Sequence, residues 1–325
     1  MRPWLDRPVL VTGATGIVGS HLCAELLQRG AHVVALIRDD DPQSALYRDG
    51  IAPRCSIVRG ELQRYDDCIR ALNSHDIEVV FHLGAQTLVG TALREPLETF
   101  ESNVRGSYNL FEAARRLPDL VKAVVVASSD KAYGDSAVLP YTEDMPLAGK
   151  HPYDVSKSCT DLLASCYAAT YGLPITIARC GNIYGPGDLN WSRIVPGTIR
   201  SILAGQRPVL RSNGTNVRDY IYVADVVSAY VALAEQIESS EVRGEAFNFS
   251  PESEVTVLEI VEAIGRLMGT HLEPLVLDVA KHEIKSQTLD AAKARRVLGW
   301  KPTYLLDDGL NETILWYRMM LAQTA

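Results

Sequence analysis

Apolar and polar positions in the first half of the chain follow two alternating periods. Runs of consecutive apolar, often β-branched residues, typical of buried parallel strands, occur at 8–12, 32–37, 55–59, 78–83, 121–128 and 174–179. Between them, apolar residues recur at helical spacing at 17–29, 65–74, 98–116 and 151–171. Strands that alternate with helices in this way predict an α/β fold built on a doubly wound parallel sheet.

A glycine-rich segment links the first strand to the first helix. Gly13, Gly16 and Gly19 stand at the spacing of the dinucleotide fingerprint, and Gly30 ends the helix that follows. The first glycine permits a tight turn, the second lets the backbone approach a pyrophosphate, and the third allows close packing of helix and strand. A glycine-rich turn without a ligand is the alternative. The strands on both sides favour dinucleotide binding, and therefore a sheet of the Rossmann type.

The second half of the chain has a different texture. Gly, Pro, Asn and aromatic residues crowd 181–220, and helical spacing then recurs at 193–204, 223–237, 256–268 and 308–321. We therefore predict a dinucleotide-binding domain at 1–180. Residues 181–325 are predicted to form mainly a smaller substrate-binding lobe, with some segments returning to the sheet of the first domain.

Composition excludes several other classes of protein. The 325 residues are 47% hydrophobic and 22% charged, with a net charge of −8, which is typical of a globular protein without a basic patch for nucleic acid. No apolar run reaches the length of about 18 residues that a membrane helix needs. The first six residues lead straight into a strand, so no signal peptide is expected. Six cysteines form no CxxC pair, and seven histidines lack metal-ligand spacing. We expect a cytoplasmic protein with reduced core cysteines and no metal.

Two segments carry residues suited to redox chemistry on an alcohol. Tyr153 and Lys157 are four residues apart, so they share one face of a helix. Ser129 follows an apolar strand, whose carboxyl end faces the ligand crevice of a doubly wound sheet. Because the ordinary pKa of tyrosine is about 10, the phenol needs a neighbouring positive charge, from lysine or nicotinamide, to act as a base.

These segments fit one family in order along nearly the whole chain. The matching segments are 12–19, 81–86, Asn103, 128–134, 153–157, 179–188, 218–226 and 289–300. The chain resembles the extended short-chain dehydrogenase/reductases, in their nucleotide-sugar epimerase and dehydratase branch. The resemblance implies that Tyr153 takes the proton of a sugar 4-hydroxyl, Ser129 hydrogen-bonds that oxygen, and Lys157 holds the nicotinamide ribose.

The resemblance also implies an assembly. Relatives pair the helices corresponding to 98–116 and 151–171 across a two-fold axis, so we expect a homodimer. Both helices carry apolar residues beyond a single stripe: Leu110, Phe111, Leu162, Leu163 and Cys166.

The residues after Ser129 distinguish two reactions. Epimerases of this family usually have small or apolar residues there, whereas sugar 4,6-dehydratases have an acid that protonates the leaving 6-hydroxyl, and most have Glu next as the base for carbon 5. Asp130 followed by Lys131 is similar to CDP-glucose 4,6-dehydratases, as are the lead-in with Trp4 and the stretch 283–290. We predict a nucleoside-diphosphate-glucose 4,6-dehydratase, with CDP-glucose one candidate substrate. The alternative is a 4-epimerase, in which Asp130 and Lys131 form a strand-end ion pair.

Two other functional classes fit the sequence less well than a dehydratase or an epimerase. A cofactor-binding regulator would not need the triad, and a simple ketone reductase would release its cofactor at each turnover.

The resemblance further implies a set of cofactor and substrate contacts. Arg38 suits the 2′-phosphate of NADP and Asp39 the ribose hydroxyl of NAD; we predict tightly bound NADP, with NAD as the alternative. Arginine suits a substrate diphosphate because its planar fork binds two oxygens. The predicted cofactor contacts are Gly13, Thr15, Gly16, Ile17, Val18, Gly19, Arg38, Asp39, Glu61, Leu62, Leu83, Gly84, Ala85, Gln86, Asn103, Tyr153 and Lys157. The predicted substrate contacts are Gln86 and Thr87 at the sugar, Asn182 at the diphosphate, and Arg193, Arg211 and Arg218 at phosphate or base.

Overall fold

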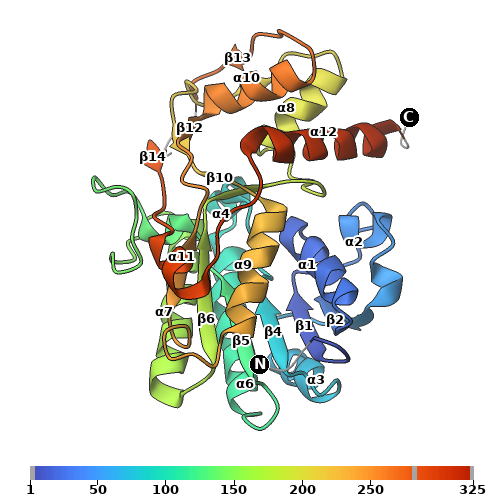
Figure 1. The fold of residues 1–325 in the computed structure, drawn as a ribbon, viewed down its shortest axis with the longest axis vertical. Coiled ribbons are helices and arrows are strands. Elements are labelled where there is room, and N and C mark those ends of the chain that lie inside the picture. Colours follow the sequence, from blue (N-terminus) through green and yellow to red (C-terminus); the bar gives the residue numbers. More distant parts are fainter. Residues whose placement is uncertain (1–3, 280–283, 323–325) are drawn as a thin grey trace.

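A seven-stranded parallel sheet forms the centre of the molecule (Figure 1). The computed structural model describes residues 4–279 and 284–322; Glu283 of the stretch noted above and the first three residues of the lead-in lie outside them. The strand order is β11-β6-β5-β4-β1-β2-β3, and every neighbouring pair is parallel. The strands are β1 (Pro8–Thr12), β2 (His32–Ile37), β3 (Ser56–Arg59), β4 (Val79–His82), β5 (Ala123–Ala127), β6 (Ile175–Cys180) and β11 (Ala246–Phe249). The predicted α/β fold class is confirmed.

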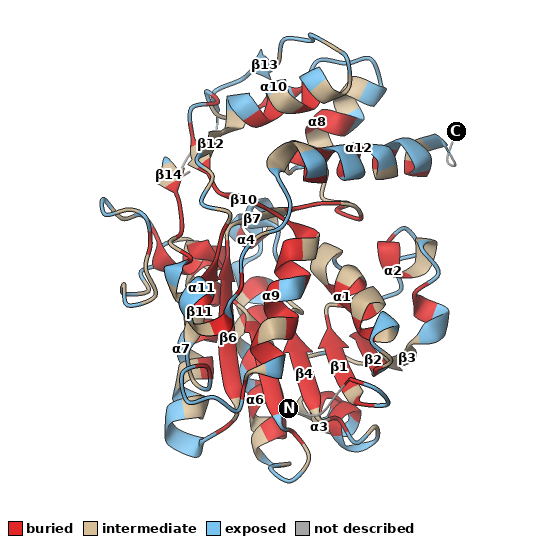
Figure 2. Cartoon of the chain, in the orientation of Figure 1, coloured by how far each residue is buried: buried red, intermediate tan, exposed pale blue. Residues whose placement is uncertain are grey.

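Helices cover both faces of this sheet, so its strands are buried on two sides (Figure 2). One core lies between the sheet and the helices α1 (Ile17–Gln28), α9 (Val223–Glu235) and α11 (Ala292–Leu298). A second core lies between the opposite face and α3 (Tyr65–Asn73), α6 (Gly106–Arg115) and α7 (Pro152–Tyr171). Val9 and Val11 enter the first core and Leu10 the second, as the two-residue period of a strand requires. Continuous apolar runs therefore predicted these strands correctly.

The predicted helix at 98–116 is divided into three helical segments. They are α5 (Pro96–Phe100), a π-helical turn η2 (Glu101–Arg105) and α6. Leu110 and Phe111 on α6 are fully buried in the second core, so they are not surface residues of a dimer interface, and that part of the expectation is wrong. Leu162 is 58% exposed and Cys166 is exposed, whereas Leu163 is half-buried against the same core. Fewer apolar side chains are therefore exposed on the outer side of α7 than the sequence predicted.

The C-terminal half supplies a lobe above the sheet (Figure 1). Its apolar core packs α8 (Ile194–Leu203), α10 (Val257–Leu267) and α12 (Leu306–Ala322) together. The C-terminal half also contains two short parallel strand pairs: β7 (Asn182–Tyr184) with β10 (Tyr220–Tyr222), and β8 (Val209–Leu210) with β13 (Leu275–Val276). A third small sheet places β9 (Val217–Arg218) between β12 (Val255–Thr256) and β14 (Ser286–Gln287). The remaining helical segments are α2 (Ala45–Arg48), η1 (Ala52–Arg54), α4 (Val89–Arg94) and η3 (Asp130–Tyr133).

The six cysteines are unpaired, but they are not all core residues. Cys23, Cys68 and Cys180 are buried, whereas Cys55 and Cys159 are half-buried and Cys166 is exposed on α7. The expectation of core cysteines is therefore wrong for Cys166, because that residue lies on the outer side of its helix.

Candidate functional site

The glycine turn after β1 forms a cradle that only glycine fits. Gly13 has a φ of +69°, and a Cβ there would lie 2.8 Å from the backbone nitrogen of Gly84. A Cβ at Gly19 would lie 2.1 Å from the carbonyl oxygen of Gly13. Gly16 is exposed and occupies the N-cap of α1, whose first turn contains no acidic residue. This open helix N-terminus suits a diphosphate, so the residues present fit the predicted dinucleotide.

A chain of buried hydrogen bonds holds the cradle against the loop after β4. Thr12 Oγ1 accepts from the N–H groups of Leu83 and Gly84, at 3.1 and 2.9 Å. His82 lies 3.0 Å from Thr12 Oγ1 through Nδ1 and 2.9 Å from Ser107 Oγ through Nε2. Burial, and to a smaller extent the charge of Lys157, lowers the pKa of His82 to about 3, so the ring is neutral. Sequence reasoning did not single out Thr12 or His82, whose role depends on this cross-strand packing.

Asn103 supports the loop that was predicted to line the cofactor. Its Oδ1 accepts from the Gln86 N–H at 2.7 Å, and its Nδ2 donates to the Gln86 carbonyl at 3.0 Å and to Ser156 Oγ at 2.9 Å. Gln86 in turn donates to Thr99 Oγ1 at 3.1 Å. Both amide ends of Asn103 are thus occupied by protein groups, and the residue fixes the backbone of the loop next to the cradle.

Tyr153 and Lys157 lie on the buried face of α7, opposite the end of β5. Lys157 Nζ donates to the Ala127 carbonyl at 2.7 Å. Burial lowers the pKa of Lys157 to about 8, against the opposing charge of Asp161. Burial also raises the pKa of Tyr153 to about 12, and the positive charge that acts against this belongs to Arg193. Burial therefore outweighs the protein's own positive charge at this phenol, and the lowering of its pKa by lysine and a bound nicotinamide together stays a prediction.

Ser129, Asp130 and Lys131 lie at the carboxyl end of β5 and begin η3. Ser129 Oγ donates to Asp130 Oδ1 at 2.9 Å, and a hydrogen bond with Tyr153 is among the factors that lower the pKa of the tyrosine. Asp130 is 2% exposed, and its Oδ2 has no partner among the residues that the structure describes. Lys131 Nζ donates to Gln287 Oε1 at 2.9 Å. Asp130 Oδ1 accepts from Ser129 and Lys131 donates to Gln287, and no ion pair between Asp130 and Lys131 is found among the described residues.

A buried ion pair anchors this turn from behind. Arg179 on β6 forms two hydrogen bonds of 2.8 Å with Asp161, which lies one helical turn beyond Lys157. The same guanidinium donates to the hydroxyl of Tyr133, the last residue of η3, at 2.8 Å. The pair therefore links the helix of Tyr153 and Lys157 to the turn of Ser129, Asp130 and Lys131.

The predicted substrate arginines occupy the lobe side of the site. Arg193 is the N-cap residue of α8 and pairs with Asp188 at 3.1 Å. Arg211 donates to the carbonyl of Ser192 at 3.1 Å, which brings it beside Arg193. Arg218 on β9 is 8% exposed and donates to the carbonyls of Val217 and Lys285 at 2.8 and 3.3 Å. Asn182 is half-buried on β7, and Thr87 is exposed in the loop after β4.

The predicted adenosine contacts lie along the edge formed by β2 and β3. Arg38 follows β2, is 53% exposed, and pairs with Asp39 at 2.6 Å and with Glu98 at 3.9 Å. Glu61 is exposed, and its N–H donates to Asp67 at 3.0 Å. A side chain at Gly84 would meet Leu62 at 2.7 Å, so Leu62 lies directly against the loop after β4. The other cradle residues, Thr15, Ile17, Val18 and Ala85, are half-buried around the turn.

Two further polar residues near Ser129, Asp130 and Lys131 were not predicted as site residues. Asp219 and Gln287 are 1% and 0% exposed, and Asp219 Oδ1 and Gln287 Nε2 have no partner among the described residues. Burial raises the pKa of Asp219 to about 7, while its hydrogen bond with Ser250 acts in the opposite direction. Asp219 directly follows Arg218 in a segment that the family resemblance had marked, but nothing in the sequence indicates its burial.

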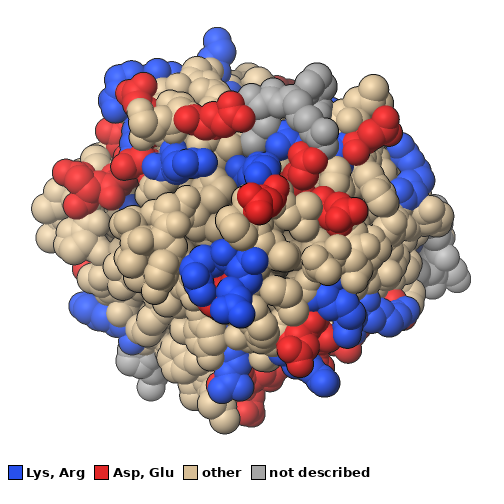
Figure 3. Space-filling model, turned by 90° about the horizontal axis from the view of Figure 1, so that it is seen from below, with Lys and Arg blue, Asp and Glu red and all other residues tan. Residues whose placement is uncertain are grey.

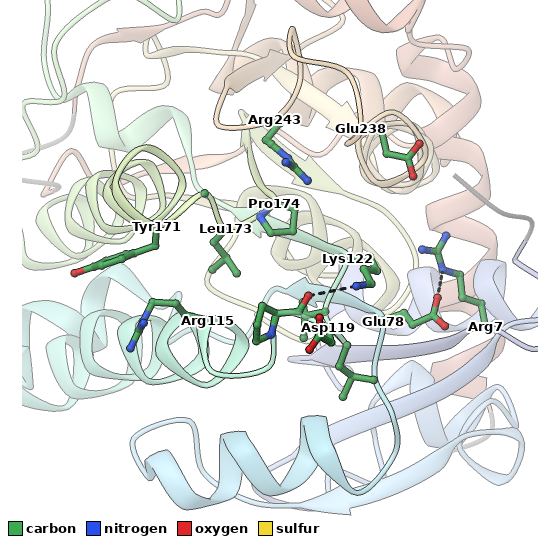
Figure 4. A pocket seen from close by; sticks show the side chains of 14 residues that line it. Arg7, Glu78, Arg115, Asp119, Lys122, Tyr171, Leu173, Pro174, Glu238 and Arg243 are labelled. Carbon is green, nitrogen blue, oxygen red and sulfur yellow. Dashed lines mark hydrogen bonds and ion pairs between the residues drawn. The ribbon is translucent and has the colours of Figure 1, made fainter.

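A hollow at the opposite edge of the sheet contains none of the predicted site residues (Figure 4). Its volume is about 640 Å³, and it is lined by residues that precede strands, among them Arg7, Glu78, Lys122, Pro174 and Arg243. Arg7 pairs with Glu78 at 3.2 Å, and Lys122 donates to a backbone carbonyl at 3.3 Å. Figure 3 views the molecule from below, the side of this edge, and basic and acidic side chains are interspersed there. Because no predicted site residue lines it, this hollow is not the candidate site.

Two other kinds of site are absent from the part of the chain that the structure describes. No cluster of three or more His, Cys, Asp or Glu side chains is arranged to hold a metal ion there. No helix in that part combines the length and apolar character that crossing a bilayer requires.

Comparison with known proteins assigns the fold and the family. A model of the NAD dependent epimerase/dehydratase family matches residues 9–249. CDP-glucose 4,6-dehydratase of Salmonella typhimurium is 30% identical, over 97% of this chain and 91% of that protein. The structure of UDP-glucose 4-epimerase from Thermotoga maritima with UDP-glucose superposes with a TM-score of 0.88 at 29% identity, covering 97% of this chain and 99% of that one.

A third relative adds a bound dinucleotide. The dTDP-glucose 4,6-dehydratase of Bacillus anthracis, solved in complex with NAD, superposes with a TM-score of 0.85 at 27% identity, covering 96% of this chain and 97% of that one. Relatives of this chain thus include both dehydratases and epimerases of nucleotide sugars, and NAD is the dinucleotide bound in this solved relative. The chain belongs to the NAD dependent epimerase/dehydratase family.

Proposed function

We propose that this protein is a nucleotide-sugar 4,6-dehydratase, which converts a nucleoside-diphosphate glucose to the 4-keto-6-deoxy sugar with loss of one water. The observation that carries the proposal is the pair Asp130 and Lys131 directly after Ser129. Asp130 presents a buried carboxyl oxygen without a protein partner, and Lys131 holds its amine at the same edge of the sheet. Oxidation at carbon 4 alone needs neither group. Elimination between carbons 5 and 6 needs an acid and a base.

The proton transfers follow from these positions. Tyr153, as the phenolate that the positive nicotinamide would favour, takes the proton of the 4-hydroxyl. Lys131, as the neutral amine, takes the proton of carbon 5, which is acidic beside the 4-ketone. Asp130, as the carboxylic acid, protonates the 6-hydroxyl, which leaves as water. Lys131 then returns its proton to carbon 5. Ser129 lies between Tyr153 and Asp130, so the proton lost from the 4-hydroxyl has a hydrogen-bonded route to restore the acid.

The dinucleotide would lie between the Gly13 cradle and Lys157. When bound, it would supply reversible hydride transfer to and from the sugar, so it would not be consumed. Lys157 is suited to hold the nicotinamide ribose, and the open N-terminus of α1 to hold the diphosphate. Arg38 supports NADP, because a guanidinium pairs with a 2′-phosphate, whereas Asp39 supports NAD. Either dinucleotide would compete with the ion pair between these two residues.

The substrate diphosphate would lie across the lobe side of the site. Arg193 and Arg218 supply the positive charge there, and the influence of Arg193 on Tyr153 indicates that the two side chains are near one another. A substrate gripped by its diphosphate would therefore present its sugar to Tyr153, Asp130 and Lys131.

We also propose a homodimer formed through the outer side of α7. Leu162 on α7 is 58% exposed, and the neighbouring α4 and α5 expose Leu93 by 49% and Leu97 by 73%. Exposed apolar side chains on adjacent helices are typical of a subunit interface. Light scattering should give a dimer mass at micromolar concentration, and a monomer mass would contradict this proposal.

The direct test of the activity is a panel of nucleoside-diphosphate glucoses. The purified protein is incubated with each, and products are analysed by mass and by absorbance in alkali, which detects a 4-keto sugar. Loss of one water with a 4-keto product supports the dehydratase. A product of unchanged mass that differs at carbon 4 identifies an epimerase instead, the activity named for the Thermotoga maritima relative.

A further inference from the structure

Gln287 joins the C-terminal lobe to the proposed base. It lies on β14, 156 residues from Lys131 in the sequence, and its Oε1 is 2.9 Å from Lys131 Nζ. The side chain is fully buried. The lysine ammonium has only N–H donors, so it faces the amide oxygen of Gln287 and not the amide nitrogen. This hydrogen bond orients one N–H of Lys131, and the other substituent positions on its nitrogen stay available to other partners.

The amide nitrogen of Gln287 forms no hydrogen bond within the part of the chain that the structure describes. Gln287 Nε2 is buried and has no acceptor among the described residues. Asp130 Oδ2, at the same edge of the sheet, is also buried and has no hydrogen-bond partner among the described residues. A buried amide N–H₂ without an acceptor is costly, so its presence beside the proposed base indicates an acceptor that a bound molecule supplies. An oxygen of the substrate sugar has the required chemistry.

Strand pairing connects this amide to the proposed diphosphate grip. β14 pairs with β9 in parallel register, and Gln287 is the direct partner of Arg218. Residues in register on neighbouring strands project to the same side of a sheet. A substrate that binds Arg218 through its diphosphate is therefore held by the strand next to Gln287.

We propose that Gln287 is a positioning residue for Lys131, and that its free amide N–H donates to an oxygen of the bound sugar. The amide oxygen holds the amine so that its lone pair, in the neutral form, is directed to carbon 5. The amide nitrogen fixes the sugar relative to that amine. This inference rests on the proposed dehydratase activity.

Two substitutions separate the two ends of the amide. Gln287→Met keeps the length of the side chain but removes both hydrogen-bonding groups. Gln287→Glu keeps an oxygen facing Lys131 and removes the N–H donor. Ser286→Ala, the preceding position of β14, is the control, because Ser286 is outside the proposed machinery. The holoenzymes are compared for kcat, KM, solvent deuterium entry at carbon 5, and absorbance of the reduced nicotinamide.

Gln287→Met should slow deuterium entry at carbon 5 by about tenfold or more, as expected for losing the hydrogen bond that orients the amine. Reduced cofactor should accumulate, because oxidation at carbon 4 depends on Tyr153. Gln287→Glu keeps an oriented oxygen, but its carboxylate favours the ammonium over the neutral amine, so exchange should recover only as the pH is raised. Its KM should rise by about tenfold, since one hydrogen bond to the sugar is lost. Ser286→Ala should resemble the wild type. Wild-type exchange and KM in both Gln287 variants would overturn the proposal.

A measurement without substrate separates failure of this inference from failure of the proposed function. Competitive labelling with acetic anhydride, read by mass spectrometry, gives the reactivity of the Lys131 amine relative to Lys122. Releasing the amine in Gln287→Met should raise its labelling severalfold over wild type. If no sugar nucleotide loses water yet labelling rises, the dehydratase proposal fails and the positioning contact stands. Unchanged labelling, with water loss intact in the wild type, shows that Gln287 does not position Lys131.

Discussion

The polar side chains at the two edges of the central sheet differ in how far the protein itself satisfies them. At the amino edge, where the strands begin, Arg7 pairs with Glu78 at 3.2 Å and Lys122 donates to a carbonyl at 3.3 Å. These residues line a hollow of about 640 Å³. At the carboxyl edge, Asp130 and Gln287 keep buried polar atoms without a partner among the described residues. Burying a polar atom unpaired is costly, so such atoms persist where a ligand satisfies them. Unsatisfied buried polarity therefore marks the candidate site better than the presence of a hollow.

The largest effect should come from removing one hydroxyl at the carboxyl edge. Tyr153→Phe deletes the proposed base and keeps the ring packed, so turnover should fall by about 10²–10⁴-fold, the range for general acid–base groups. Tyr171→Phe, at the other end of the same helix and 55% exposed, is the matched control and should keep wild-type turnover. Steady-state rates of both proteins on the same substrate decide the matter. Near wild-type turnover in Tyr153→Phe would remove the tyrosine from the mechanism.

The same lysine-to-methionine substitution, made at each edge of the sheet, tests the difference between the two edges. Lys131→Met should lower the rate of proton loss from carbon 5 by about 10²-fold or more, because the proposed base is gone. Lys122→Met, at the exposed amino edge, should change neither rate nor stability measurably, as is usual for surface substitutions. Deuterium entry at carbon 5 and denaturant midpoints measure both variants. Equal effects of the two substitutions would mean that the edges do not differ as described.

The pKa of Asp219 predicts a pH dependence of stability that belongs to the carboxyl edge. Burial raises this pKa to about 7 from the ordinary value of 3.8, so between these values the folded protein holds a proton that the unfolded chain has lost. The contribution of Asp219 to stability is therefore present below about pH 4 and is lost as the pH rises through 7. Asp219→Asn does not titrate, and it should gain stability relative to wild type over that window. Urea unfolding of both proteins from pH 4 to 8 tests the sign; a constant difference would contradict the burial argument.

A smaller effect is expected at the adenosine end of the carboxyl edge. If Arg38 pairs with a 2′-phosphate, Arg38→Ala should weaken NADP binding by about tenfold, the value of one charge-assisted hydrogen bond, and leave NAD binding nearly unchanged. The dinucleotide released on denaturing the wild-type protein gives an independent reading by mass. Release of NAD alone would assign this position to Asp39 or to the backbone.

Sequence patterns predicted the sheet better than the lobe. The runs at 8–12 and 32–37 coincide with β1 and β2, and the helix expected at 151–171 is α7, because each element is long enough to display its period. β11 was missed because its four residues interrupt the apolar run with Asn248, and β9 and β14 are two residues each. Such strands exist through tertiary pairing, which no local period records.

Some residues of the candidate site could likewise be predicted from the sequence and others could not. Ser129, Tyr153 and Lys157 were predicted together because Tyr153 and Lys157 have a local spacing and because all three fit the family resemblance. Gln287 was not, because its role depends on a contact with Lys131 across 156 residues. Burial, which the sequence did not indicate, raises the pKa of Tyr153 in the protein alone, so the expected lowering depends on the bound nicotinamide as well as on lysine.

The central claim is that the carboxyl edge eliminates water, and one experiment tests it most directly. The wild-type protein and Asp130→Asn are incubated in deuterated solvent with the nucleoside-diphosphate glucose that the panel identifies. The wild type should release a product lighter by one water with deuterium at carbon 5. Asp130→Asn should retain oxidation at carbon 4, seen as absorbance of reduced nicotinamide, and lose the expulsion of the 6-hydroxyl. Interconversion of two intact sugars that differ at carbon 4, with no deuterium at carbon 5, would contradict the account and identify an epimerase.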